Sequence, residues 1–142
     1  MITCTDEIEV EAKTEKLDMV TEFVNEAVLR AGCPGKISMQ IMLALEELFV
    51  NVASYAYAPG TGKCKIQLEI KKLENSEGMV SITILDSGKE FNPLRKENPD
   101  ITLSADERQI GGLGIYMVKE IMDSVAYEYK NGQNHLTMVK HW

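Results

Sequence analysis

Two polar residues, Glu47 and Asn51, stand four positions apart in a mostly apolar stretch of the sequence. Glu47 and Asn51 lie in a segment whose apolar residues recur at helical spacing, so both side chains fall on one stripe of a helix. Tyr55 is next along this stripe, which borders the apolar face, whereas Glu46 points nearly away from it. A carboxylate and an amide at such a margin can serve as a general base and a cation ligand. A solvated helix face is the alternative interpretation of the pair.

A second candidate group stands where a strand-like apolar run stops, at Asp86-Ser87-Gly88. A carboxylate there can accept a hydrogen bond from the exocyclic amine of adenine. It would reject guanine, which presents an acceptor at that edge. Taken alone, the tripeptide is also compatible with a simple turn.

The third motif is a run of glycines, Gly111-Gly112-Leu113-Gly114, that opens a predicted helix. Glycines let backbone N–H groups approach an anion, and a helix N-terminus favours negative charge. A flexible loop with a packing glycine is the alternative. The run does not fit the dinucleotide-binding fingerprint, because it follows a long loop and Met117 stands in place of the third glycine.

Composition excludes several classes of function. The chain has 142 residues, about the size of one domain, and its 44% hydrophobic and 26% charged residues are typical of a globular protein. A net charge of −7 argues against a nucleic-acid partner, because such binding relies on Lys and Arg at the phosphates. The longest apolar runs are about five residues, so no membrane span is predicted, and no signal peptide is seen. Three widely spaced cysteines and two histidines fit no disulfide framework, zinc site or triad, and the chain is expected to be cytoplasmic.

Hydrophobic periodicity predicts the elements that position these motifs, in the order β-α-α-β-β-loop-α-β-β. The expected elements are a strand near 8–12, a helix from about 14 to 31 with Thr14 as its cap, a helix over about 37–53 with a core stripe of Ile41, Leu45, Leu48 and Val52, strands at 64–71 and 80–86, a helix after Gly114, and strands near 125–130 and 136–140. Segregated hairpins and helices predict one α+β domain over residues 1–142. Its architecture is a two-layer α/β sandwich with a mixed, mainly antiparallel sheet. Residues 87–110 lack periodicity, and a structureless connection of this length is often functional.

Together the motifs resemble those of the Bergerat-fold ATPases, the superfamily that includes the histidine kinase-like ATPase domains. Glu47-Leu48-Phe49-Val50-Asn51 resembles the N box, Asp86-Ser87-Gly88-Lys89-Glu90-Phe91 the adenine-binding box, and Gly111-Gly112-Leu113-Gly114-Ile115 the second glycine box. Residues 110–123 and the ending Asn134-His135-Leu136-Thr137-Met138-Val139-Lys140 are similar to the bacterial anti-sigma factor serine kinases. The resemblance covers nearly the whole chain, with the motifs in the family's order and spacing.

The resemblance implies ATP and Mg²⁺ as cofactors and gives each motif residue a role. Glu47 would be the general base, and Asn51 would hold Mg²⁺ together with phosphate oxygens and waters. The other implied nucleotide ligands are Asp86 for adenine, Gly88 for close access of the base, Gly111, Gly112 and Gly114 for the phosphates, Arg108 for the γ-phosphate, and Thr137 as support for the adenine site. Arg108 falls late in an implied ATP lid of about residues 89–110.

The function that the resemblance implies is that of an ATP-dependent protein serine/threonine kinase. Its substrate would be an anti-anti-sigma (STAS-type) protein, it would also sequester a sigma factor, and a homodimer is favoured. The alternative is a nucleotide-sensing binding module that regulates a partner without phosphorylating it. Retention of Glu47 favours the kinase. Glu90, which replaces a usual glycine, favours the binding module, and Tyr55 stands where this branch commonly has histidine.

Overall fold

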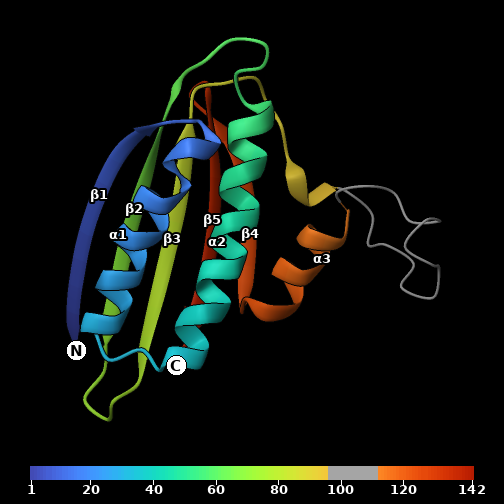
Figure 1. The fold of residues 1–142 in the computed structure, drawn as a ribbon. Coiled ribbons are helices and arrows are strands. Elements are labelled where there is room, and N and C mark those ends of the chain that lie inside the picture. The colour runs from blue at the N-terminus through green and yellow to red at the C-terminus, as the bar shows by residue number, and fades with distance from the viewer. Residues whose placement is uncertain (96–111) are drawn as a thin grey trace.

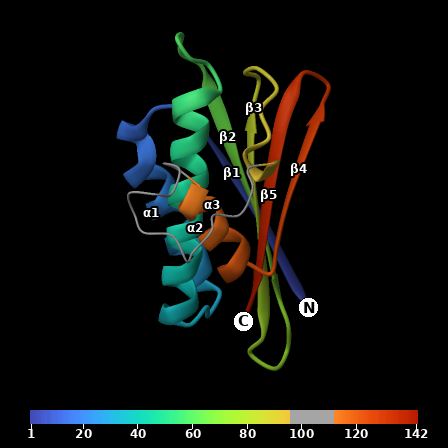
Figure 2. The ribbon, with the colours of Figure 1, turned by 90° about the vertical axis from the view of Figure 1, so that its right-hand side faces the viewer.

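The structure is a computed structural model that describes residues 1–95 and 112–142. Along the chain it contains β1 (Ile2–Glu11), the short 3-10 helix η1 (Thr14–Lys16), α1 (Leu17–Arg30), α2 (Gly35–Tyr55), β2 (Lys63–Lys72), β3 (Gly78–Asp86), the 3-10 helix η2 (Pro93–Arg95), α3 (Gly112–Ile121), β4 (Ser124–Lys130) and β5 (Gln133–His141). The strands form one layer and the α-helices form the other, on a single face of the sheet (Figures 1 and 2). The predicted two-layer α+β sandwich is confirmed.

The five strands form one sheet in the order β1-β2-β3-β5-β4. Every neighbouring pair is antiparallel. The expected mixed sheet is therefore wrong in one respect, since no parallel pair occurs among the described strands. The reason is visible in Figure 1: α1 and α2 run in opposite directions between β1 and β2, so the chain returns to the sheet antiparallel to the strand it left.

Alternation along the strands decides which side chains face the helices. In β2 the residues that face the helices are Cys64, Ile66, Leu68 and Ile70. All four are buried, as the sequence pattern predicts. In β3 they are Val80, Ile82, Ile84 and, at the strand end, Asp86. Asp86 is thus a buried carboxyl on the helix-facing side of the sheet.

Helix α1 begins later than the sequence suggests. Thr14 starts the short helix η1, the residues at the N-caps are Lys13 and Lys16, and neither makes a side-chain capping bond. The prediction that Thr14 caps the helix is therefore wrong, because a 3-10 turn precedes the α-helix. The predicted stop is confirmed, since α1 ends at Arg30 and Gly32 adopts a φ of +93° that side chains rarely tolerate.

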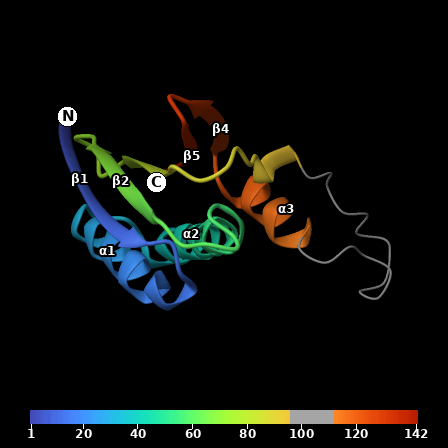
Figure 3. The ribbon, with the colours of Figure 1, turned by 90° about the horizontal axis from the view of Figure 1, so that it is seen from above.

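Helix α2 is the central helix of its layer, as the view from above shows (Figure 3). All four residues of the predicted stripe are buried against the sheet. By length and composition alone, with a mean hydropathy of 1.3 over 18 residues, α2 could also cross a membrane, and 44% of that window is buried inside the protein. The length of the uninterrupted apolar runs did not indicate this high mean hydropathy, because Glu46, Glu47 and Asn51 interrupt the runs. Burial of one face against the sheet is what a core helix requires.

Candidate functional site

Glu47 and Asn51 lie one turn apart on α2, as their spacing predicts. The Asn51 side chain is only 7% exposed. Its Nδ2 donates to the backbone carbonyl oxygen of Glu47 at 2.8 Å and lies 3.3 Å from the carboxylate oxygen Oε1 of Glu47. Glu47 is half-buried and Glu46 is exposed, so the expected orientation of these neighbours is confirmed.

The amide oxygen of Asn51 has the chemistry that Mg²⁺ requires. Both hydrogen bonds of the side chain use Nδ2, and none joins Oδ1 to a described residue. Mg²⁺ prefers oxygen ligands and usually keeps water and phosphate oxygens in its shell. Among residues 1–95 and 112–142 there is no group of three or more His, Cys, Asp or Glu side chains that could hold a metal ion. Asn51 thus fits a Mg²⁺ that is held mainly by a nucleotide, and the described residues form no all-protein metal site.

One carboxylate oxygen of Asp86 accepts hydrogen bonds within the protein, and the other is available to a ligand. The residue is 4% exposed. Its Oδ1 accepts hydrogen bonds from the Gly88 N–H at 2.9 Å and from Asn134 Nδ2 at 2.8 Å. No hydrogen bond joins Oδ2 to a described residue, which leaves it able to accept from a ligand.

Burial raises the pKa of the Asp86 carboxyl above its ordinary value of 3.8, and the hydrogen bonds from Asn134 and Gly88 oppose this rise. A raised pKa in the folded state means that the native protein binds the proton more tightly than the unfolded chain does. The ionised carboxylate therefore costs stability above the raised pKa, and this cost disappears as the pH falls through it.

We expect the affinity for ATP to decrease as the pH falls toward this raised pKa. A protonated Asp86 would offer a donor at Oδ2, where the adenine amine needs an acceptor. Calorimetric titrations from about pH 7.5 down to about pH 5 would measure the effect, with Asp86→Asn as the variant that cannot titrate. Protonation of ATP itself affects the unaltered protein and Asp86→Asn alike, so the difference between them reports on Asp86. Identical pH dependence in the two would contradict the prediction.

The sequence analysis missed the main partner of Asp86, which is Asn134. This side chain is 4% exposed and stands directly opposite Asp86 in the β3–β5 register. Its Nδ2 also donates to the Lys89 carbonyl oxygen at 2.9 Å, while its Oδ1 accepts from the Phe91 N–H at 3.1 Å and from the Tyr127 hydroxyl. Asn134 therefore ties the start of the segment after β3 to β4 and β5. The signal that would have found it is a polar residue in the apolar series that continues with Leu136 and Met138.

Thr137 does not support the Asp86 pocket. Its hydroxyl shares a 2.9 Å hydrogen bond with Thr83, its partner in the register. Both residues belong to the alternate series of their strands, which faces away from the helices and from Asp86. The structure thus places Asn134, and not Thr137, in the position beside the carboxyl.

Gly88 has a structural reason to lack a side chain. A Cβ there would lie 2.1 Å from the carbonyl oxygen of Ala56 at the end of α2. The adjacent Lys89 N–H donates to the same oxygen at 3.0 Å. This close approach joins the end of α2 to the segment that follows Asp86.

We expect Gly88→Ala to lower the free energy of unfolding by about 1–3 kcal/mol, because the added methyl meets backbone and the two segments must separate. Urea denaturation would measure the loss. Gly35→Ala is the matched control, since a Cβ at Gly35, the first residue of α2, meets nothing within 4 Å. Equal stability of the Gly88 and Gly35 variants would show that the close approach of Gly88 to the Ala56 carbonyl does not contribute to stability.

The glycine motif lies partly outside the described residues. Gly111 lies outside them, and so do residues 96–110 of the implied lid, which include Arg108. Gly112 is the first residue of α3, so the helix that was expected after Gly114 begins earlier and includes Gly112 and Gly114. Gly114 lies in the first turn of α3, against the Glu47 carboxylate. The structure therefore brings the third motif to the first.

Comparison with known proteins identifies the family. Residues 10–140 match the histidine kinase-like ATPase domain. The chain belongs to this family. Serine/threonine-protein kinase BtrW of Bordetella bronchiseptica is 26% identical over 141 residues, which cover 99% of this chain and 96% of that protein. Serine-protein kinase RsbW of Bacillus thuringiensis is 24% identical over 134 residues, covering 92% and 81%.

A solved structure supports the fold independently. A chain in the crystal structure of the SiaB-SiaC complex from Pseudomonas aeruginosa matches with a TM-score of 0.53 and 11% identity, over 100% of this chain and 90% of that one. At this identity the likeness concerns the fold alone.

In this histidine kinase-like ATPase domain, one pocket joins the first two motifs. Asn51, Asp86, Phe91, Tyr127 and Asn134 are among its lining residues. Its free space is about 10 Å³, the room of about one water molecule, so a purine needs the lining to move. The Phe91 ring packs on Tyr55 at the end of α2, with ring centroids 5.3 Å apart.

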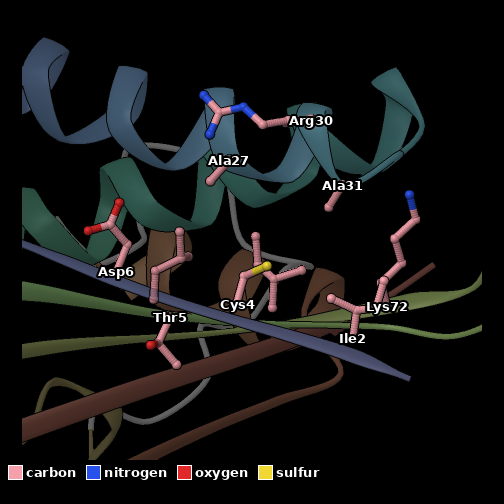
Figure 4. Close-up of a pocket in the computed structure, with 10 residues that line it drawn as sticks. Ile2, Cys4, Thr5, Asp6, Ala27, Arg30, Ala31 and Lys72 are labelled. Carbon is pink, nitrogen blue, oxygen red and sulfur yellow. The ribbon is translucent and has the colours of Figure 1, made fainter.

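A wider cavity of the ATPase domain lies elsewhere. It occupies about 350 Å³ between α1 and strands β1 and β2, where Ala27 and Ala31 leave room (Figure 4). Arg30 and Lys72 stand at its rim. None of the candidate site residues lines it, so the pocket that joins the motifs and this wider cavity are different places.

Proposed function

We propose that the chain is an ATP-dependent protein serine/threonine kinase. The observation that carries the proposal is the arrangement on α2: a half-buried Glu47 carboxylate beside Asn51, whose Oδ1 is available to a cation, with Asn51 and Asp86 lining one pocket. The family and the relatives named serine/threonine kinases support it. At 24–26% identity these relatives leave the activity itself to be tested.

In the proposed reaction, ATP is bound with adenine at Asp86 and its phosphates toward Asn51 and α3. Glu47 takes the proton of a serine or threonine hydroxyl as that oxygen bonds to the γ-phosphorus. The bond from this phosphorus to the β,γ-bridging oxygen breaks, and its electron pair leaves with ADP. Bound Mg²⁺ would neutralise phosphate charge. Arg108, outside the described residues, is proposed to offset charge on the γ-phosphate.

We further propose an anti-anti-sigma (STAS-type) protein as the substrate and a sigma factor as a second partner. The support is the resemblance of residues 110–123 and 134–140 to anti-sigma factor serine kinases. A homodimer, and a lid over about residues 89–110, belong to the same proposal.

The alternative is an ATP-sensing module that binds a partner without phosphorylating it. Glu90 favours this alternative, because it stands next to Phe91 of the pocket and adds a negative charge close to the site of a polyanionic ligand. The two proposals share the nucleotide site and differ only in whether phosphate is transferred.

The first experiment is calorimetric titration of the purified protein with ATP and GTP, with and without Mg²⁺. Mg²⁺-dependent ATP binding with GTP weaker by at least about tenfold is expected, because an acceptor at Asp86 pairs with the adenine amine and opposes the guanine oxygen. No binding of either nucleotide would overturn both proposals.

The second experiment incubates the protein with γ-labelled ATP and purified STAS-domain proteins. Label on a serine or threonine of one of them is the expected result. Nucleotide-dependent binding of such a protein without transfer of label would select the sensing module.

A further inference from the structure

Gly114, in the first turn of α3, bounds the space in which the Glu47 carboxylate lies. A Cβ placed on Gly114 would be 2.2 Å from both the carboxyl carbon Cδ and Oε1 of Glu47, and 2.5 Å from Oε2. Atoms that are not bonded do not approach this closely. The carboxylate therefore occupies the volume that any side chain at position 114 would fill.

The position of the carboxylate is set from two sides. On α2, Asn51 Nδ2 lies 3.3 Å from Oε1, and on α3 the backbone of Gly114 closes the space. Among the described residues, no lysine, arginine or histidine forms an ion pair with Glu47. Among the described residues, the room left at Gly114 thus contributes to where the carboxylate lies.

We infer that Gly114 is a positioning residue for Glu47, because the missing side chain lets the carboxylate lie between α2 and α3. This inference rests on the proposed kinase function. It differs from a phosphate-cradling role, in which Gly114 would act on the nucleotide and not on the base.

A comparison with Gly88 shows why the two glycines should respond differently to a methyl group. At Gly88 the obstacle is the backbone of Ala56, which cannot move without separating two segments. At Gly114 the obstacle is the far end of a flexible side chain, which can rotate away. Alanine is also favoured over glycine within a helix. Gly114→Ala should therefore keep the fold and displace the carboxylate.

The test measures three properties of Gly114→Ala. We expect phosphate transfer to fall by about a hundredfold, as for a reacting group misplaced by about 1 Å. The dissociation constant for Mg·ATP should change by less than about threefold, and the midpoint of thermal unfolding should not decrease. Gly35→Ala, which adds the same methyl in open space, should match the unaltered protein in all three.

Glu47→Asp provides a second variant that separates positioning from other roles. Its carboxylate is retracted by one methylene and no longer needs the space at Gly114. If Gly114 acts through the carboxylate, adding Gly114→Ala to Glu47→Asp should lower transfer by less than about threefold further. Multiplication of the two single effects would overturn the inference.

A direct readout does not require an acceptor protein. In protein carrying ¹³C-carboxyl-labelled glutamate, the Glu47 signal is identified by its loss in Glu47→Gln, and Gly114→Ala should move it. An unmoved signal would overturn the inference, and so would a loss of ATP affinity as large as the loss of transfer. Absence of transfer by the unaltered protein would instead overturn the proposed function, and the carboxyl signal would still decide the role of Gly114.

Discussion

Glu47→Gln is expected to lower phosphate transfer by about 10²–10⁴-fold while ATP affinity changes little. Glutamine has the same size, keeps an oxygen for the Asn51 hydrogen bond and fits the same space against Gly114. It cannot take up the proton of the attacking hydroxyl. Because proton transfer occurs only in the transition state, the loss should be in kcat and not in KM. Single-turnover transfer from γ-labelled ATP measures the rate of phosphate transfer, and calorimetric titration with ATP measures the affinity.

Glu46→Gln is the matched control for this substitution. The two glutamates are neighbours on α2, but Glu46 is exposed and Glu47 is half-buried. The same change of charge at Glu46 should leave transfer within about twofold of the unaltered rate, as is usual for an exposed position. Wild-type transfer by Glu47→Gln, or an equal loss in both variants, would show that Glu47 is not the base.

For the candidate site, the side-chain positions that the sequence predicted correctly are those set within one element. Glu47 and Asn51 share a helix, and helix geometry alone fixes which side chains four residues apart are neighbours. The same logic places Glu46 outward and the apolar stripe of α2 inward. Asp86 was found because it ends an alternating strand, and alternation also determines its face.

The parts that the sequence did not predict depend on contacts between elements. Alternation indicates that Asn134, Leu136 and Met138 share one face of β5, but only the β3–β5 register shows that Asn134 stands opposite Asp86. Thr137 was assigned to the pocket by resemblance, and the register instead pairs it with Thr83. The helix was expected to follow Gly114, yet Gly112 and Gly114 lie within α3, where packing against α2 outweighs the low helix propensity of glycine.

Asn134→Ala is expected to lower the free energy of unfolding by about 3 kcal/mol and to weaken ATP binding by at least about tenfold. The substitution removes one hydrogen-bond partner each from Asp86 Oδ1, the Lys89 carbonyl, the Phe91 N–H and the Tyr127 hydroxyl. Among the described residues, Asp86 would keep only the hydrogen bond from the Gly88 N–H, and the segment after β3 would lose the two bonds that join Lys89 and Phe91 to β5. Urea denaturation and calorimetry with ATP measure the two effects.

Thr137→Ala is the control that separates the adenine pocket from the rest of β5. It also removes a side-chain hydrogen bond, the one to Thr83, but on the face of the sheet away from Asp86. We expect a loss of stability of about 1 kcal/mol and no change in ATP affinity. Because both substitutions lie on the same strand, general weakening of β5 would reduce ATP binding in Thr137→Ala as well. Weaker ATP binding by Thr137→Ala than by Asn134→Ala would restore the assignment of Thr137 to the pocket and contradict the role of Asn134 beside Asp86.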